Sequence, residues 1–481
     1  MSNSDADELV ALTATAAAAQ IRAGELTAQE LVDAHLTRIE TYNPRVNAIV
    51  TIDPEGALAR AASADAVPLA QRGPLHGVPI AIKDTAQTAG MRTTYGLPQY
   101  ADNIPPSDDL HVARIMQAGA ILIGKTNVPE GAVGSHTVNR VFGATRNPYD
   151  LSRSAGGSSG GAAAALASRF IPIADGSDMG GSLRNPASFC SVVGIRPTPG
   201  MVPNSEGSDT FNPLATNGAM ARTVSDAALL LSVIAVPGPA DIPTPLIDPV
   251  TLRNLDPIPL RGLRVAYAPD LGGRVPVDPQ VRDVLDRTAT LLTESGAQVS
   301  LACPDLDGAD AAFRTLRAAD FDLMWGDVLS ADPDAFVDFM AGNIRAGQNL
   351  SGREVMAAYA EITRLRRAAA RFFANFDVVL APAAQIPPFP VEWDWPHAVA
   401  GVVMDDYLQW MRAAWLFTPL GIPGLSLPAG FTPSGLPVGA QILAAAGNDV
   451  GLLRVALRVE RTLDLPFIDP LKEEQYESDP A

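Results

Sequence analysis

Apolar residues follow a helical spacing near the start of the chain and form short continuous runs further on. In residues 31–40 the apolar positions recur every three or four residues, and Thr27 and Glu30 form a capping box just before them, so we expect a helix that begins there. The apolar runs at 78–82 and 121–124 are typical of buried strands, and a helical pattern lies between them. This alternation predicts an α/β fold with a largely parallel sheet.

Two glycine-rich loops make the stretch from 143 to 200 the least ordinary part of the chain. The first, Gly-Gly-Ser-Ser-Gly-Gly at 156–161, precedes an alanine-rich helix at 162–168 and a strand at 170–174. The second loop, at 176–182, precedes a short helix. Loops that pass directly into helices between structured segments are candidate functional sites.

The second half of the chain continues the alternation of helices and strands. Its proline-rich segment 237–260 is the best linker candidate. We expect helices at 225–236, 281–295 and 450–462, strands at 263–268, 297–304, 376–384, 424–431 and 436–443, and mostly helical structure over 308–375.

Charge and cysteine content narrow the partners and the compartment. The 481 residues include 53 acidic and 35 basic side chains, a formal net charge of −18. This charge argues against nucleic acid or an anionic membrane as a partner, because both attract a basic face. Apolar residues are 47% of the chain, enough to bury a large core. Cys190 and Cys303 cannot form a disulfide framework, and the acidic first residues lack the apolar segment of a secretion signal, so we expect a cytoplasmic protein.

Lysine is rare in this chain, and one lysine ends an apolar strand. Only Lys83, Lys125 and Lys472 are lysines among the 35 basic residues. Arginine keeps its proton near neutral pH, whereas a desolvated lysine can lose it and act as a general base. Lys83 is therefore our candidate base. The alternative is that Lys83 reaches solvent or pairs with Asp84. Lys125 could serve by the same logic, whereas Lys472 lies in the polar tail.

The glycine loops supply candidate nucleophiles and hydrogen-bond donors. Ser158 and Ser159 each stand at the centre of a Gly-x-Ser-x-Gly pattern, which an α/β-hydrolase would combine with a downstream histidine. That histidine could only be His397, which lies beside tryptophans and suits a packing role as well. The amides that precede Ser182 can form an anion-binding nest of the kind that stabilises an oxyanion. The alternatives are a flexible linker for the first loop and a plain turn for the second.

Three separated motifs together resemble the amidase signature family. They are Gly-Val-Pro-Ile-Ala-Ile-Lys-Asp with Lys83, the first glycine loop with Ser158, and Gly-Ser-Asp-Met-Gly-Gly-Ser with Ser182. The spacings of 75 and 24 residues between these three side chains match the family as well. The likeness extends over nearly the whole chain, which makes it far more specific than any one motif.

The resemblance implies the fold and the domain organisation. We expect a single α/β/α domain over 1–481, with a large mixed, mostly parallel central sheet flanked by helices. The core signature region would span about 75–200, and a variable helical region at about 308–415 would form the substrate pocket.

The resemblance also implies roles for the motif residues. Ser182 would be the nucleophile, and Ser158, preceded by a cis peptide bond, would bridge it to Lys83 as the base. No metal or organic cofactor would be needed. The oxyanion hole would consist of the backbone amides of Met179, Gly180, Gly181 and Ser182.

Two features suggest where the substrate binds. Many relatives carry an aromatic residue at the position that Gly131 occupies, which predicts a roomier pocket there. All five tryptophans lie between 320 and 420, where family members vary most. They could form an aromatic wall for an aryl or long apolar substrate, or they could be ordinary packing residues. The pocket candidates are Gly131, Trp325, Trp410 and Trp415.

Three functions remain open at this point. The first is a serine hydrolase that cleaves the C–N bond of an aryl or bulky apolar carboxamide or anilide through an acyl-enzyme, with carbamates (urethanes) or esters as extensions. The second is the glutamine-hydrolysing subunit of a tRNA-dependent amidotransferase. The third is a non-catalytic binding protein on the same fold. For the hydrolase we expect a small amide or carbamate and water as partners, no nucleic acid or membrane, and a homodimer by analogy with relatives.

Overall fold

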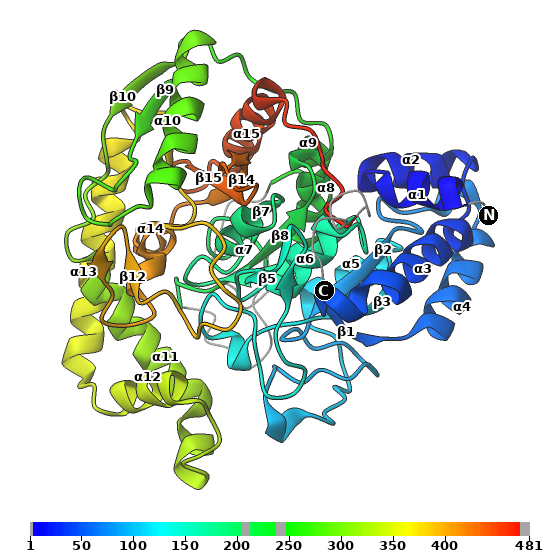
Figure 1. Ribbon diagram of the computed structural model, residues 1–481, viewed down its shortest axis with the longest axis horizontal. Helices are drawn as coiled ribbons and strands as arrows, with labels where there is room; N and C mark the ends of the chain where they lie inside the picture. Colours follow the sequence, from blue (N-terminus) through cyan, green and yellow to red (C-terminus); the bar gives the residue numbers. More distant parts are fainter. Residues whose placement is uncertain (1–2, 204–211, 237–246, 472–481) are drawn as a thin grey trace.

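One continuous sheet of eleven strands runs through the molecule (Figure 1). The computed structural model describes residues 3–203, 212–236 and 247–471. Two short antiparallel pairs lie outside the main sheet, β4 (Arg146–Asn147) with β5 (Asp150–Ser154) and β12 (Ala398–Val399) with β13 (Val402–Val403). In order of pairing, the main strands are β1 (Ile49–Ile52), β3 (Ile121–Thr126), β2 (Pro79–Lys83), β6 (Ile173–Asp178), β8 (Thr216–Ala221), β7 (Val193–Arg196), β14 (Gly424–Phe431), β15 (Pro437–Leu443), β11 (Val378–Pro382), β9 (Arg264–Tyr267) and β10 (Gln298–Leu301).

The sheet is mixed, as expected, but the prediction that it is mostly parallel is wrong. Parallel pairing is confined to β2 with β3 and β6, and to β9 with β10 and β11. The other six neighbouring pairs are antiparallel. In two of these pairs, β2 with β3 and β9 with β10, a helix connects consecutive strands and returns the chain to the end of the sheet where the first strand began, so the second strand runs parallel to the first. In the middle of the sheet β14 and β15 are joined by a short loop instead, which requires antiparallel pairing.

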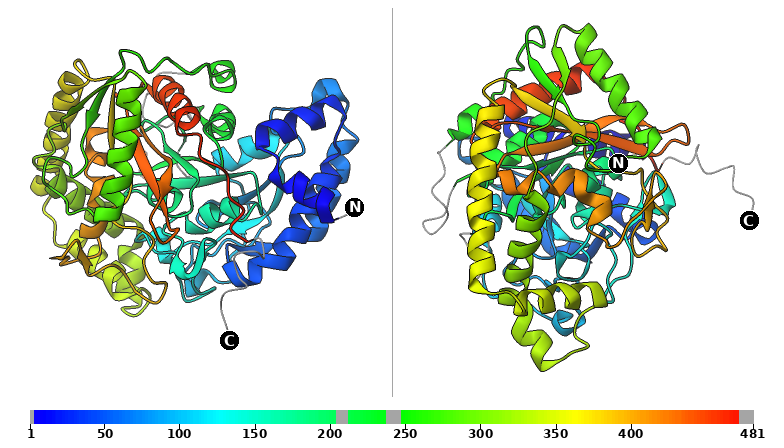
Figure 2. Two further views of the ribbon diagram at one scale, coloured as in Figure 1. Left: turned by 45° about the horizontal axis from the view of Figure 1, so that its top comes forward. Right: turned by 90° about the vertical axis from the view of Figure 1, so that its left-hand side faces the viewer.

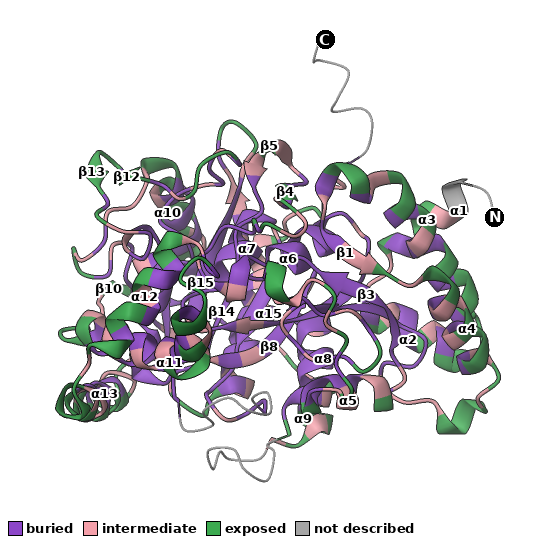
Figure 3. Ribbon diagram, turned by 90° about the horizontal axis from the view of Figure 1, so that it is seen from below, coloured by how far each residue is buried: buried purple, intermediate pink, exposed green. Residues whose placement is uncertain are grey.

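Helices cover both faces of the sheet and enclose two large apolar cores, beside a small third cluster formed by Ala17, Ile21, Leu26 and Leu31. Figure 2 shows this layering from the side, and Figure 3 shows that buried residues concentrate at the sheet while the outer helices carry the exposed ones. One core receives side chains from α3 (Ala28–Val46), α4 (Pro54–Asp65), α6 (Gly160–Ala167), α7 (Arg184–Phe189), α11 (Ala309–Ala331), α12 (Asp338–Gln348), α13 (Gly352–Phe372) and α14 (Arg412–Trp415). The other receives them from α2 (Ala14–Ala23), α5 (Leu110–Gln117), α8 (Val224–Ile234), α9 (Pro249–Arg253), α10 (Pro279–Glu294) and α15 (Asp449–Leu463), while α1 (Asn3–Ala11) completes the helices.

The alternation of side chains along β2 determines the direction of Lys83. Ile80 and Ile82 belong to one core, and Ala81 belongs to the other. Because successive residues of a strand point to opposite faces, Lys83 points to the same face as Ala81, where the N-terminus of α6 lies. The strand therefore delivers its terminal amine to the first glycine loop.

Most expected elements are present, with shifted ends. The capping box of Thr27 and Glu30 begins α3 as predicted. The strand expected at 170–174 lies at 173–178 instead, so the second glycine loop supplies its last residues.

Strands on both sides of the proposed linker 237–260 belong to the same sheet. Residues 237–246 of that segment, like Lys472, lie outside the described residues. Its later part contains α9, which packs on α8. Over the described ranges, every helix is too short or too polar to cross a bilayer.

Candidate active site

Lys83 is buried, and its amine lies among three serine hydroxyls. Only 1% of the residue is exposed. Its Nζ lies 2.8 Å from Ser158 Oγ, 2.9 Å from Ser159 Oγ and 2.9 Å from Ser177 Oγ. Both parts of the alternative for Lys83 are therefore wrong: the side chain does not reach solvent, and Asp84 hydrogen bonds to Thr94 instead.

Burial lowers the pKa of Lys83 to about 7, although the charges of Asp175 and Asp178 act to raise it. A lysine with this pKa is about half neutral at pH 7 and can accept a proton. Asp175 Oδ1 accepts the backbone N–H of Lys83 at 2.7 Å, and Asp175 Oδ2 lies 3.3 Å from His111 Nε2. Asp175 therefore holds the end of β2 in position, and its charge favours the protonated form of Lys83.

The first glycine loop brings Ser158 to Lys83 at the start of α6. The Gly157–Ser158 peptide bond is cis, as the resemblance implies. The next residue, Ser159, donates its backbone N–H to the carbonyl oxygen of Ser182 at 3.1 Å, which joins the two glycine loops. Ser158 and Ser182 both border one cavity of about 500 Å³. Among the described residues, a hydrogen bond joins Lys83 to Ser158 but none joins Ser158 to Ser182.

A buried carboxylate organises the second glycine loop. Asp178 Oδ1 accepts the N–H of Gly181 at 2.8 Å, and its Oδ2 accepts that of Leu183 at 3.2 Å. Arg184 donates to both carboxylate oxygens, at 3.0 and 2.9 Å. Burial would raise the pKa of Asp178, but the charge and hydrogen bonds of Arg184, with the charge of Arg196, lower it to about 2. The carboxylate is therefore ionised and keeps the loop in one conformation.

The predicted oxyanion donors are not equivalent in the structure. The N–H of Gly181 is used by Asp178, whereas Met179, Gly180 and Ser182 border the cavity. Gly181 has φ +101°, and a Cβ there would lie 2.6 Å from Ala414 Cβ. Only glycine satisfies both the conformation and the space at this position.

Aromatic residues form much of the cavity wall. Trp325 borders the cavity as predicted, and Tyr100 meets it edge to face with ring centroids 6.2 Å apart. Gly131 also borders it, at φ +56°. A Cβ at Gly131 would lie 2.6 Å from Met340 Cε, so Met340 already fills the space that a larger side chain at this position would need. Among the described residues, Tyr95, Phe313 and Phe321 also contribute rings to the wall.

The prediction that Trp410 and Trp415 line the pocket is wrong. Trp410 is 1% exposed and packs against Phe189 and Phe389 in the core. Trp415 is fully buried and stacks on Phe313, with ring centroids 4.5 Å apart. Trp415 therefore lies one layer behind the wall, because Phe313 separates it from the cavity. The packing interpretation holds for these two residues.

The remaining candidates have structural roles. His397 is exposed and hydrogen bonds to Asp394 rather than to either glycine loop, so the Ser–His interpretation is wrong. Lys125 is buried, and its Nζ donates to Ala86 O at 2.5 Å and Thr88 Oγ1 at 2.8 Å. Burial lowers its pKa to about 8, but it does not border the cavity. In residues 3–203, 212–236 and 247–471, no group of three or more histidine, cysteine, aspartate or glutamate side chains is arranged to hold a metal ion.

Several cavity residues were not predicted. Ser159 and Ser177 complete the shell around Lys83, and their proximity depends on how the two loops meet. The sequence did contain a signal for the cavity-lining face of α11, because the residues on that face recur at helical spacing. They include Phe313, Arg317, Asp320, Phe321 and Met324.

A family model described as Amidase matches residues 30–453. The chain belongs to the amidase signature family. An acylamidase of Rhodococcus erythropolis is 35% identical over 469 residues, which cover 93% of this chain and 95% of that relative. A glutamyl-tRNA(Gln) amidotransferase subunit of Acidothermus cellulolyticus is 37% identical over 490 residues and 94% of each chain. The crystal structure of a bacterial aryl acylamidase of this family has a TM-score of 0.85 at 26% identity and covers 94% of this chain and 96% of that one. This amidase signature protein is a hydrolase that acts on amides.

Proposed function

We propose that this hydrolase cleaves the C–N bond of aryl or bulky apolar carboxamides and anilides, through an acyl-enzyme formed on Ser182. The observation that carries the proposal is the position of Lys83: a buried amine with a pKa of about 7, hydrogen-bonded to Ser158, beside the cavity that Ser182 borders. A neutral amine in that position can act as a base toward a hydroxyl. A binding protein without catalysis would have no use for it.

The proposed reaction begins with a proton relay. Neutral Lys83 takes the proton of Ser158 Oγ as Ser158 takes that of Ser182, whose Oγ attacks the substrate carbonyl carbon. The carbonyl oxygen becomes an oxyanion that accepts hydrogen bonds from backbone amides of the second glycine loop. We assign this role to Met179, Gly180 and Ser182, and we assign the N–H of Gly181 to loop geometry because Asp178 accepts it.

The relay then reverses to release the amine. Ser158 gives its proton to the leaving nitrogen as the C–N bond breaks, and Lys83 returns a proton to Ser158. Ser182 is left as an acyl ester. A water molecule then attacks this ester while the same base accepts its proton. This step releases the carboxylic acid and restores the Ser182 hydroxyl. The bonds and protons balance without a further reactant.

The substrate preference rests on the cavity wall. The rings of Tyr95, Tyr100 and Trp325 line a cavity of about 500 Å³, which is large enough for an aryl group, and aromatic side chains favour aromatic ligands. The names of two relatives, an acylamidase and an aryl acylamidase, are consistent with this preference. Carbamates and esters offer the same carbonyl carbon to Ser182 and are proposed as secondary substrates.

One observation favours glutamine hydrolysis as a second candidate. Arg317 and Asp320 border the cavity one turn apart on α11, and such a pair could hold the α-carboxylate and α-ammonium groups of glutamine. One of the relatives is also a glutamyl-tRNA(Gln) amidotransferase subunit. The aromatic wall is unsuited to so polar a substrate.

A substrate panel distinguishes the candidates. Purified protein is assayed with an aryl amide, an aliphatic amide, an aryl carbamate and glutamine, each beside a Ser182→Ala variant as control. We expect the aryl amide to give the highest kcat/KM and the variant to be inactive. Glutamine as the best substrate would support the second candidate, and equal rates with the variant would reject hydrolysis at Ser182.

A further inference from the structure

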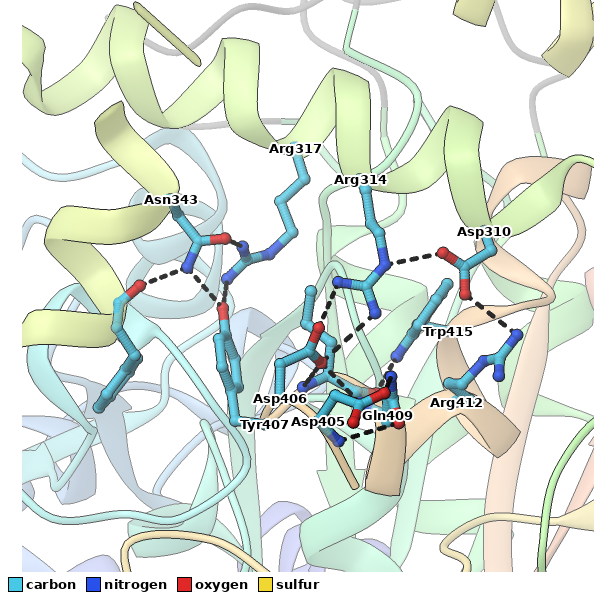
Figure 4. Close-up of polar contacts among 12 residues, drawn as sticks. Asp310, Arg314, Arg317, Asn343, Asp405, Asp406, Tyr407, Gln409, Arg412 and Trp415 are labelled. Carbon is cyan, nitrogen blue, oxygen red and sulfur yellow. Dashed lines mark hydrogen bonds and ion pairs between the residues drawn. The ribbon is translucent and has the colours of Figure 1, made fainter. Parts of the chain in front are cut away.

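The arginines that join α11 to residues 405–415 have very different partners. Figure 4 shows Arg314 between two carboxylates: its Nε lies 2.7 Å from Asp310 Oδ1 and its Nη1 lies 2.7 Å from Asp406 Oδ2. Arg412 shares Asp310, at 3.0 Å. The carboxylates of Asp310 and Asp406 are therefore paired with the guanidinium groups of Arg314 and Arg412.

Arg317, one turn further along α11, has only neutral hydrogen-bond partners among the described residues. It donates to the side-chain oxygen of Asn343 and to the hydroxyl of Tyr407, as Figure 4 shows. Its guanidinium carbon lies 4.1 Å from the ring centroid of Phe321. Among the described residues, no ion pair joins Arg317 to a carboxylate, although the residue is 5% exposed.

A buried cation without an anionic partner is costly, because neutral hydrogen bonds replace only part of its hydration. Burial lowers the pKa of Arg317, and the charge of Arg314 acts in the same direction, while Tyr407 and the more weakly acting Asp320 oppose them. Arginine nevertheless keeps its proton near neutral pH. The charge therefore persists, and it lies in the wall of the cavity that Ser182 borders.

We propose that Arg317 is a specificity-determining residue that binds a carboxylate on the substrate, at a position remote from the scissile amide. This inference deepens the proposed function, on which it rests. A planar guanidinium suits a carboxylate because the two groups can form parallel hydrogen bonds. Asn343 and Tyr407 fix the orientation of the guanidinium, and Phe321 packs on its face. The preferred substrate is then an aryl amide that also carries a carboxylate.

Matched substrate pairs test the proposal for both sides of the amide. In the first pair, glutaryl para-nitroanilide is compared with the isostere in which a methyl ketone replaces the carboxylate. In the second pair, the butyryl amide of para-aminobenzoate is compared with that of para-aminoacetophenone. The first pair places the carboxylate on the acyl group and the second places it on the leaving amine. For each pair the ratio of kcat/KM, carboxylate over ketone, is measured.

We expect the wild type to favour the carboxylate about tenfold or more in at least one pair, as one charge-assisted hydrogen bond allows. Arg317→Gln should reduce this ratio to near one. Arg317→Lys keeps the charge but loses the planar fork, so it should give an intermediate ratio even if the glutamine variant does not fold. Arg314→Gln is the matched control, because Arg314 lies one turn before Arg317 on α11 and contacts the same 405–415 segment but does not border the cavity, and it should keep the wild-type ratio.

A binding measurement on an inactive variant tests this inference independently of the proposed function. In a Ser182→Ala variant, the dissociation constants of the same intact amides are measured by titration calorimetry. Tighter binding of the carboxylate member, lost with the additional Arg317→Gln change, supports the inference even if no amide is hydrolysed. A wild-type kcat/KM ratio of one or less in both pairs would overturn the inference, and so would an unchanged ratio in Arg317→Gln. Neither result would contradict the proposed function if the amides that carry the ketone are still hydrolysed.

Discussion

Replacing Asp175 by asparagine should move the acid limb of the pH profile to lower pH. If neutral Lys83 is the base, kcat/KM rises with pH through the pKa of Lys83, about 7. Asp175 favours the charged amine, and its described partners are the backbone N–H of Lys83 and the ring of His111. The other carboxylate that acts on Lys83 is Asp178, which Arg184 already neutralises. Without the charge of Asp175, the neutral amine persists to lower pH.

The size of the effect follows from the position of the midpoint. The loss of one nearby buried charge changes a pKa by about 1 unit or more. With a midpoint at about 7, roughly a tenth of Lys83 is neutral at pH 6; with a midpoint one unit lower, about half is neutral. The quantity to compare is the fraction of the plateau kcat/KM that remains at pH 6. This fraction should be about five times larger in Asp175→Asn than in the wild type.

The assay is kcat/KM for an uncharged para-nitroanilide, measured across the acid limb in buffers of constant ionic strength. Asp84→Asn is the matched control: Asp84 is also buried and follows Lys83 directly, but it hydrogen bonds to Thr94 and is not among the charges that shift the pKa of Lys83. The control should keep the wild-type midpoint. A midpoint in Asp175→Asn that stays or rises, or an equal shift in the control, would refute the reasoning.

Further substitutions test the other parts of the site. Lys83→Ala should lower kcat for an anilide by roughly 10²–10⁴-fold, and near-normal turnover would remove Lys83 from the mechanism. Gly181→Ala should lower the free energy of unfolding by about 2–3 kcal/mol in urea titrations, because φ is +101° and the new Cβ meets Ala414; unchanged stability would contradict the loop geometry. Trp325→Ala should raise KM for aryl amides with little loss of stability. Trp415→Ala should instead destabilise the protein by about 3–5 kcal/mol, and the reverse pattern would contradict the assignment of wall and core.

Much of the fold follows from local sequence patterns. Where helices and apolar runs alternate strongly, as in 78–124 and 263–301, both the elements and their parallel pairing are as expected. The pattern did not reveal β8, because Thr216–Ala221 consists mostly of small and polar residues without alternation. Its place near the centre of the sheet depends on pairing with β6 and β7, which the residues of β8 alone do not specify.

The candidate site divides in a similar way. Lys83, Ser158 and Ser182 could be found because motifs with fixed spacing carry them, and the structure brings all three to one place. Local sequence could not distinguish Trp325 from Trp415, because both are apolar and lie in the same variable region. Tertiary packing decides which one meets the cavity. Arg317 was missed for the same reason, since its lack of an anionic partner becomes visible only when its neighbours are known.

Mass spectrometry of the covalently modified protein tests the nucleophile most directly. After incubation with a fluorophosphonate and proteolysis, we expect one phosphonylated residue, Ser182, and a labelling rate that falls with the protonation of Lys83 below about pH 7. Ser182→Ala should remain unlabelled. Labelling on Ser158, no labelling of the wild type, or equal labelling of Ser182→Ala would contradict the assignment of Ser182.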